Sequence, residues 1–102
     1  MLLQVADVLK KLTDKQILIQ GHTDNVPIGG VLKEKYPTNW ELSVDRATHV
    51  VRFLQEKGGV PPEMLVAAGY GPYRPVASNE SDDGRSQNRR IEIVLLDKEA
   101  VK

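Results

Sequence analysis

Residues 21–25, Gly-His-Thr-Asp-Asn, place an imidazole, a hydroxyl, a carboxylate and a carboxamide in a row. They follow the apolar residues 17–19, which are typical of a buried strand, so the polar side chains fall at a strand tip. A strand that only filled a core would not need polar groups there. Asp24 is therefore the first candidate for a catalytic, metal-binding or ligand-binding residue.

A cationic partner for Asp24 is predicted on the next helix. Thr38 and Glu41 match a capping box, in which each side chain satisfies a free amide of the first helical turn. This helix is predicted to run to about Lys57 and to end at Gly58. Its predicted core stripe comprises Trp40, Val44, Ala47, Val51 and Leu54.

Beside that stripe, Asn39, Leu42 and Arg46 share one flank of the helix, at i, i+3 and i+7. The flank lies about a quarter turn from the core stripe, so Arg46 is expected at the edge of the packed layer. If the helix packs beside the strand, Arg46 comes near Asp24. The pair is then either an ordinary surface ion pair, worth ~0–1 kcal/mol, or a site that holds a ligand between two charges.

Metal and hydrolytic chemistry have little support in the sequence. His22 and Asp24 are metal-ligand types, but the chain has two histidines, no cysteine and no paired-histidine spacing. Ser43 and Ser78 lack the strand-turn-helix context of a nucleophile, and no histidine–acid pair has a supporting motif. We therefore expect no metal, no cofactor and no catalytic residue.

Composition limits the remaining classes of function. At 102 residues, a single domain over residues 1–102 is expected. Charged residues make up 27% and balance to a formal net charge of zero, which disfavours nucleic-acid binding and adhesion to an anionic membrane surface. No segment is apolar enough to span a bilayer, so membrane attachment would need a segment absent from this chain.

The elements that must position these residues can be predicted from periodicity. We expect helices at 2–12 and 38–57, strands at 16–21, 65–70 and 90–96, a long polar loop to residue 37, and a helical turn about 83–87. In the last strand Ile91, Ile93 and Leu95 face one way and Glu92 the other. The order predicts an α+β fold, a two-layer sandwich with helices on one face of a small mixed sheet.

Four segments in this order, GHTDN, NWELSVDRA, GYGPYRPVASN and GRSQNRRIEIVL, resemble the OmpA-like peptidoglycan-binding domain over residues 2–96. The insert between Asp24 and Asn39 is more similar to the flagellar-motor stator branch, the MotB-like proteins, than to the outer-membrane porin branch. The resemblance implies a β-α-β-α-β-β sandwich, of which this chain lacks the first strand.

The resemblance also implies a ligand. The family binds the peptide stem of peptidoglycan without cleaving it, at the diaminopimelate residue, whose free end carries an ammonium and a carboxylate. The matching positions imply that Asp24 holds the ammonium and Arg46 the carboxylate. Asn39, Leu42 and Arg89 match residues that line the pocket, and Thr23 and Asn25 are expected neighbours of the ligand.

The expected function is thus the anchoring of an envelope or stator protein to the cell wall, in the periplasm, with attachment to the inner or outer membrane through another segment. Stator-type relatives also suggest a homodimer. Two alternatives remain: a cell-wall hydrolase or amidase, and a structural interaction domain in which Asp24 and Arg46 only pair with each other. Arg89 and Arg90 alternate along an extended chain, so at most one of them is expected to face Asp24.

Overall fold

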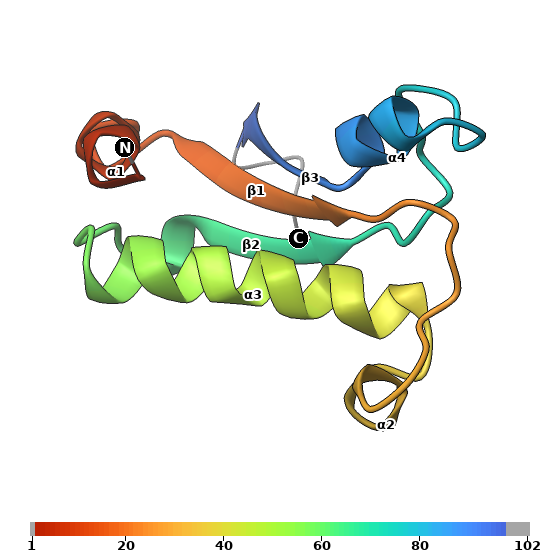
Figure 1. Ribbon diagram of the computed structural model, residues 1–102. Coiled ribbons are helices and arrows are strands. Elements are labelled where there is room, and N and C mark those ends of the chain that lie inside the picture. The colour runs from red at the N-terminus through yellow and green to blue at the C-terminus, as the bar shows by residue number, and fades with distance from the viewer. Residues whose placement is uncertain (1, 98–102) are drawn as a thin grey trace.

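The computed structural model describes residues 2–97. The chain forms a three-stranded sheet with four α-helices and a short 3-10 helix (Figure 1). The elements are α1 (Leu2–Leu9), β1 (Lys15–His22), α2 (Leu32–Lys35), α3 (Asn39–Glu56), η1 (Pro62–Met64), β2 (Leu65–Gly69), α4 (Asp82–Asn88) and β3 (Arg90–Asp97). The expected α+β class is confirmed. None of the described helices has the length and apolar character needed to cross a bilayer.

The sheet is mixed, with the strand order β2-β1-β3. The central strand β1 is parallel to β2 and antiparallel to β3. Because β1 and β3 run in opposite directions, the last residue of β1 and the first residue of β3 lie at the same end of the sheet, where His22 is opposite Arg90. The residues that follow β1 and precede β3, including Asp24 and Arg89, are therefore brought together by the sheet.

Helix α3 lies along β1 and β2 and begins as predicted (Figure 1). The Thr38 hydroxyl accepts a hydrogen bond from the Trp40 amide at 3.1 Å, and the Glu41 carboxylate accepts one from the Thr38 amide at 2.8 Å. The hydrogen bonds from Thr38 also lower the pKa of Glu41. This capping box fixes the start of α3, and hence the position of Asn39 beside the end of β1.

The contact between α3 and the sheet is very close at two glycines. A Cβ atom on Gly21 would lie 2.0 Å from the Ser43 carbonyl oxygen, and one on Gly69 would lie 2.4 Å from Val44 Cγ2. Ser43 is fully buried in this contact. The helix axis can therefore approach the end of β1 only because the sheet carries no side chain at these positions.

The predicted core stripe of α3 is wrong at its N-terminal end. Trp40 and Val44 are 47% and 44% exposed, whereas Ser43, Ala47 and Leu54 are buried. Because Ser43 packs closely against the glycines, α3 is rotated so that Ser43, and not the larger Trp40 or Val44, is buried against the sheet. The core contains Ala6, Leu9, Ile17, Ile19, Ala47, Leu54, Val60 and Met64.

Two further predictions need correction. Helix α1 ends at Leu9 rather than Leu12, because the Lys11 and Leu12 amides bond three residues back, at 3.2 and 2.9 Å, and tighten the end into a turn. The loop after β1 contains α2, which was not predicted. Its four residues are too few to show helical periodicity, and none of them is buried.

The other elements follow the predictions within one or two residues, including the helical turn that is now α4. The alternation in β3 is confirmed, because Ile93 and Leu95 pair with the buried Ile19 and Ile17 and so share their face. Ile91, Ile93 and Leu95 are nevertheless exposed, since α3 packs on β1 and β2. The second edge of β3 has no strand beside it within residues 2–97.

Candidate functional site

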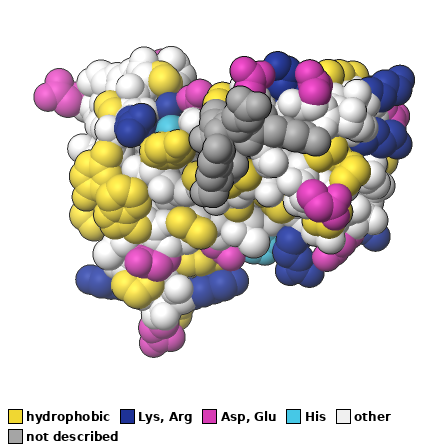
Figure 2. All heavy atoms as spheres, turned by 180° about the vertical axis from the view of Figure 1, so that it is seen from behind, with side chains coloured by type: hydrophobic (Ala, Val, Ile, Leu, Met, Phe, Trp, Pro, Cys, Tyr) yellow, Lys and Arg dark blue, Asp and Glu magenta, His cyan; other side chains and the backbone are white. Residues whose placement is uncertain are grey.

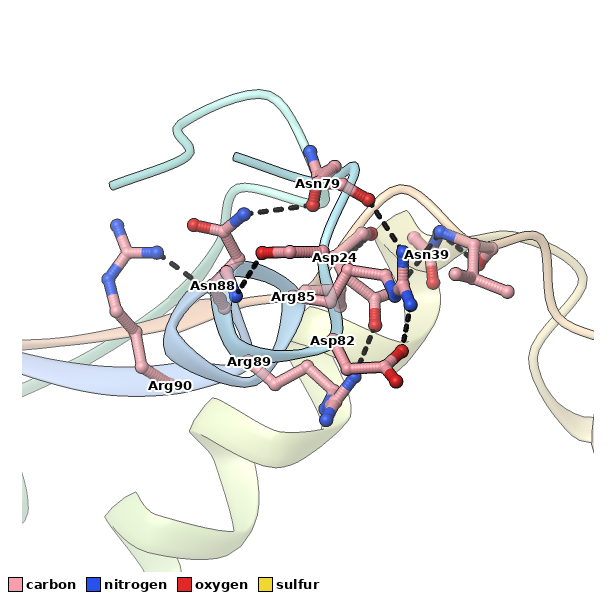
Figure 3. A network of polar contacts seen from close by, with 12 residues as sticks. Asp24, Asn39, Asn79, Asp82, Arg85, Asn88, Arg89 and Arg90 are labelled. Carbon is pink, nitrogen blue, oxygen red and sulfur yellow. Dashed lines mark hydrogen bonds and ion pairs between the residues drawn. The ribbon is translucent and has the colours of Figure 1, made fainter. Parts of the chain in front are cut away.

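Asp24 lies in the turn that leaves β1 and is only 7% exposed. Its Oδ1 accepts a hydrogen bond from the Val26 amide at 3.0 Å, and its Oδ2 contacts Arg89 Nη1 at 2.6 Å. Figure 3 shows Arg89 reaching this carboxylate from the end of α4. A backbone amide and a guanidinium thus hold the carboxylate at a fixed position beyond the end of the central strand β1.

Arg89 and Arg90, at the junction of α4 and β3, separate as expected. Arg89 pairs with Asp24, whereas Arg90 Nε donates to Glu92 at 2.5 Å and its Nη2 donates to the Arg74 carbonyl at 2.8 Å. The hydrogen bond from Arg90 holds the pKa of Glu92 below its usual value. Only Arg89 therefore belongs to the surroundings of Asp24.

Asp24 and Arg46 do not pair in the free protein, so the alternative of an ordinary surface ion pair between them is not found. Arg89 occupies the Asp24 carboxylate, and Arg46 forms no ion pair with any residue from 2 to 97. Helical spacing places Arg46 on the flank of α3 near the site, but it gives no distance to Asp24. It therefore cannot decide whether Arg46 or Arg89 pairs with the carboxylate. Arg46 is an exposed cation on the flank of α3.

The same flank of α3 is tied to the Asp24 turn. Asn39 Nδ2 donates to the Val26 carbonyl at 3.1 Å, while the Val26 amide donates to Asp24. Leu42 and Arg46 follow on this flank by helical spacing, and Leu42 is half-buried. Because Val44 lies against Gly69 of β2, this flank faces the other side of β1, where β3 runs.

Thr23 and Asn25 occupy different positions on either side of Asp24. Thr23 is buried, its hydroxyl donates to the Asp24 carbonyl at 2.8 Å, and its amide donates to the Gly71 carbonyl at 3.0 Å. Asn25 is exposed and lines a cavity. Contact of either residue with a ligand stays a prediction; in the free protein Thr23 shapes the turn.

Asn88 is a structural residue of the site that the sequence analysis missed. It is fully buried, and its Oδ1 accepts the Val76 and Ala77 amides at 2.8 and 3.0 Å. Its Nδ2 donates to the Ala77 carbonyl and to Asn79 Oδ1 (Figure 3). One amide thus fixes the loop before α4 and the residue next to Arg89. An asparagine between polar neighbours carries no sequence signal of such burial.

A cavity of about 270 Å³ opens beside the Asp24 turn. Trp40 and Tyr73 form one side, with ring centroids 5.0 Å apart. Figure 2 shows hydrophobic side chains gathered on this side of the molecule, next to the projecting arm that carries α2. The remaining lining residues are Asn25, Pro27, Ile28, Lys33, Pro37, Thr38, Asn39 and Pro72.

His22 is buried on the face of the sheet opposite α3. Its ring stacks on Tyr70 at 5.1 Å, its Nε2 lies 3.1 Å from Gln20 Oε1, and its Nδ1 has no hydrogen-bond partner. Burial is the main reason why the pKa of His22 is lowered, and the positive charges of Arg90 and Arg74 add to this, against Glu92. The geometry suits a neutral ring with its proton on Nε2, not a metal ligand.

We expect His22 to make the domain less stable at mildly acidic pH. Its pKa is lower when folded than the usual 6.5 or so when unfolded, so the unfolded chain binds the extra proton. The free energy of unfolding should fall as the pH drops below about 6.5, by at most ~1.4 kcal/mol per pH unit for one proton. Urea unfolding between pH 7.5 and 5 measures this.

The matched control for that measurement is His22→Gln, which leaves His49 and all carboxylates in place. The stability difference between the native sequence and His22→Gln should shrink as the pH falls. A difference that stays constant from pH 7.5 to 5 would show that His22 does not titrate on unfolding.

Asp24 and Arg46 offer complementary partners to a ligand that carries both charges. A carboxylate at the end of a rigid strand can accept an ammonium, and the guanidinium of Arg46 presents a planar fork to a carboxylate. The described residues around Asp24 include no base paired with a nucleophile. The arrangement is suited to non-covalent recognition.

The OmpA family model matches residues 1–89 of the chain. The chain belongs to the OmpA family. The matched region contains Asp24, Arg46 and, as its last residue, Arg89. The family expected from the sequence motifs is thus confirmed.

Two curated relatives illustrate the range of proteins that carry this domain. Motility protein B of Bacillus subtilis is 40% identical over 93 residues, which are 91% of this chain and 34% of that protein. Peptidoglycan-binding protein ArfA of Mycobacterium tuberculosis is 38% identical over 92 residues, 90% of this chain and 26% of that protein. The chain thus spans about a third or less of the length of these relatives.

Solved structures agree with this assignment. The periplasmic domain of Helicobacter pylori MotB superposes with a TM-score of 0.83 at 31% identity, covering 95% of this chain and 60% of that chain. The cell wall anchor of the T6SS from Pseudomonas aeruginosa gives a TM-score of 0.80 at 40% identity, covering 95% and 64%. The expected similarity to MotB-like proteins is therefore found in sequence and in fold over most of the chain.

Proposed function

We propose that this domain binds peptidoglycan non-covalently through the diaminopimelate of the stem peptide and anchors a cell-envelope protein to the wall. The observation that carries the proposal is the placement of Asp24, nearly buried at the end of β1, beside a helix flank that bears the unpaired Arg46. The names of two relatives, peptidoglycan-binding protein ArfA and the T6SS cell wall anchor, support binding to the cell wall.

The free end of diaminopimelate carries its ammonium and carboxylate on one carbon atom. The ammonium would meet the Asp24 carboxylate, and the carboxylate would meet the Arg46 fork. Arg46 begins about 10 Å beyond Asn39 along the α3 axis, and because helical side chains lean toward the N-terminus, its guanidinium would extend back toward the Asp24 turn in the complex. Both groups sit on rigid elements, which lowers the entropy cost of binding.

The proposed setting is the periplasmic side of the cell envelope. MotB and the T6SS anchor are examples of proteins that carry this domain. In both of these structures the protein continues beyond the region that matches this chain. Attachment to a membrane would be the role of another segment of the full protein. We propose no catalytic function, because the described residues around Asp24 offer charge complementarity and no nucleophile paired with a base.

The test is incubation of the domain with purified diaminopimelate-type peptidoglycan, followed by centrifugation and analysis of the supernatant. Binding without cleavage predicts that the protein pellets and that no soluble muropeptides appear. Release of muropeptides would support the hydrolase alternative. A protein that stays in the supernatant, with no cleavage, would support a structural interaction domain.

We expect Arg46→Lys to bind stem peptide about as poorly as Arg46→Ala, because lysine keeps the charge but loses the planar fork. Charge-assisted hydrogen bonds contribute ~1.5–3 kcal/mol, so affinity should fall roughly ten- to a hundredfold. Amidating the free carboxylate of diaminopimelate, or replacing this residue by lysine, should weaken binding to the native domain similarly. Calorimetric titration measures all of these.

Arg52→Lys is the control for the first change, since Arg52 is also on α3 but pairs with Glu56 at 3.3 Å. It should bind as the native domain does. Equal affinity of Arg46→Lys and the native domain would mean that Arg46 acts as a simple point charge and not as a fork.

A further inference from the structure

The Asp24 carboxylate is already neutralised in the free protein. Arg89 Nη1 lies 2.6 Å from Oδ2, and the Val26 amide donates to Oδ1 at 3.0 Å. A carboxylate has room for about four donors, so Asp24 can accept a ligand ammonium while both of these contacts remain. Binding of the ammonium therefore does not require Arg89 to leave.

The backbone at Arg89 is held in place by hydrogen bonds. It forms the C-cap of α4, and its amide donates to the Arg85 carbonyl at 3.1 Å. The preceding residue, Asn88, is fixed by its four hydrogen bonds to the 76–79 loop. The start of the Arg89 side chain is thus held by a rigid backbone.

The guanidinium of Arg89 is only partly used by Asp24. Its side chain is 44% exposed, and a guanidinium has five N–H donors, of which the contact with Asp24 occupies one nitrogen (Figure 3). Among residues 2–97 no second carboxylate pairs with it. The rest of the fork is open to solvent or to a ligand.

The charges around the site do not balance for a simple zwitterion. Asp24 provides one negative charge, and Arg46 and Arg89 provide two positive charges. A ligand group with one ammonium and one carboxylate is neutral, so one of the two guanidinium charges would remain without a counter-ion. A ligand with one ammonium and two carboxylates would complement all three side chains.

We infer that Arg89 binds a second carboxylate of the ligand, so that the site selects a stem peptide of net negative charge. This inference rests on the proposed function. The Asp24–Arg89 pair would persist in the complex, with the ammonium on Asp24, one carboxylate on Arg46 and the other on Arg89. Arg89 is then a specificity residue in its own right and not only a support for Asp24.

The stem peptide offers two sources for this second carboxylate. One is the α-carboxylate of the D-glutamate, which is linked onward through its side chain, and the other is the C-terminal carboxylate. The inference therefore predicts that amidation away from diaminopimelate also controls binding.

The experiment compares three tetrapeptides by calorimetry: L-Ala-γ-D-Glu-diaminopimelate-D-Ala, the same peptide amidated at the D-Glu α-carboxylate, and the same peptide amidated at its C-terminus. Each is titrated against the native domain, Arg89→Gln and Arg46→Gln at one salt concentration. One of the two amidations should weaken binding to the native domain by about tenfold or more. The sensitive position identifies the source.

The variants assign that sensitivity to a residue. Arg89→Gln should bind the unmodified peptide more weakly and should no longer distinguish it from the amidated one. Arg46→Gln should still distinguish them. If Arg89→Gln does not fold, Arg89→Lys keeps a cation beside Asp24 and should show a reduced dependence on the same amidation.

Three results would overturn the inference. If neither amidation affects the native domain while the unmodified peptide binds, there is no second carboxylate contact, and the proposed function stands. If amidation costs Arg89→Gln as much as the native domain, the carboxylate is bound by another residue. If the unmodified peptide does not bind at all, the proposed function fails together with the inference.

Discussion

Asp24→Asn should abolish pelleting with diaminopimelate-type peptidoglycan and leave the fold intact. The asparagine Oδ1 can still accept the Val26 amide, so the turn after β1 is kept. The negative charge that would hold the ligand ammonium is lost, and an amide nitrogen replaces the oxygen that faces Arg89. Loss of a charge-assisted contact predicts at least a tenfold drop in affinity.

The control for this change is Asp82→Asn. Asp82 also pairs with an arginine, Arg85, and lies at the start of α4 on the same side of the fold (Figure 3). Its side chain is exposed, so the substitution should leave both pelleting and stability close to those of the native domain. A folded Asp24→Asn protein that pellets as well as Asp82→Asn would remove Asp24 from the binding site.

Gly21→Ala should destabilise the domain by about 3 kcal/mol or more, because a Cβ atom there would lie 2.0 Å from the Ser43 carbonyl oxygen. That oxygen belongs to the backbone of α3, so relief requires the helix to move away from β1. For a domain of this size, the melting temperature should fall by roughly 10–20 °C. Thermal unfolding followed by circular dichroism measures this.

Gly29→Ala is the matched control for the glycine prediction. Nothing lies within 4 Å of the Cβ atom it would add, and Gly29 is not among the glycines with positive φ. The melting temperature should therefore change little. Similar melting temperatures for the two variants would mean that α3 and β1 are not locked together at Ser43.

The sequence predicted the elements of this fold because their signals are local. The Thr38 capping box, the apolar run before His22 and the alternation after Arg90 each define an element within a few residues. The position of Asp24 at a strand tip and the separation of Arg89 from Arg90 followed from the same rules. These parts of the site need no knowledge of the three-dimensional packing.

The remaining parts depend on contacts between distant segments. Periodicity placed Trp40 and Val44 in the core, but the glycines of β1 and β2 turn α3 so that Ser43 is buried instead. The choice of Arg89 over Arg46 as the partner of Asp24 depends on the β1–β3 register, which aligns His22 with Arg90. Such choices are set by distances that no local pattern contains.

The antiparallel pairing of β1 and β3 has a mechanical consequence if the domain is a wall anchor. Tension would enter at Asp24 and Arg89, which lie at the His22–Arg90 end of the pair. Lys15 and Asp97 pair at the opposite end of the two strands. A pull between these two ends would run along the strands, so the hydrogen bonds between them would share the load in shear and would not open one after another.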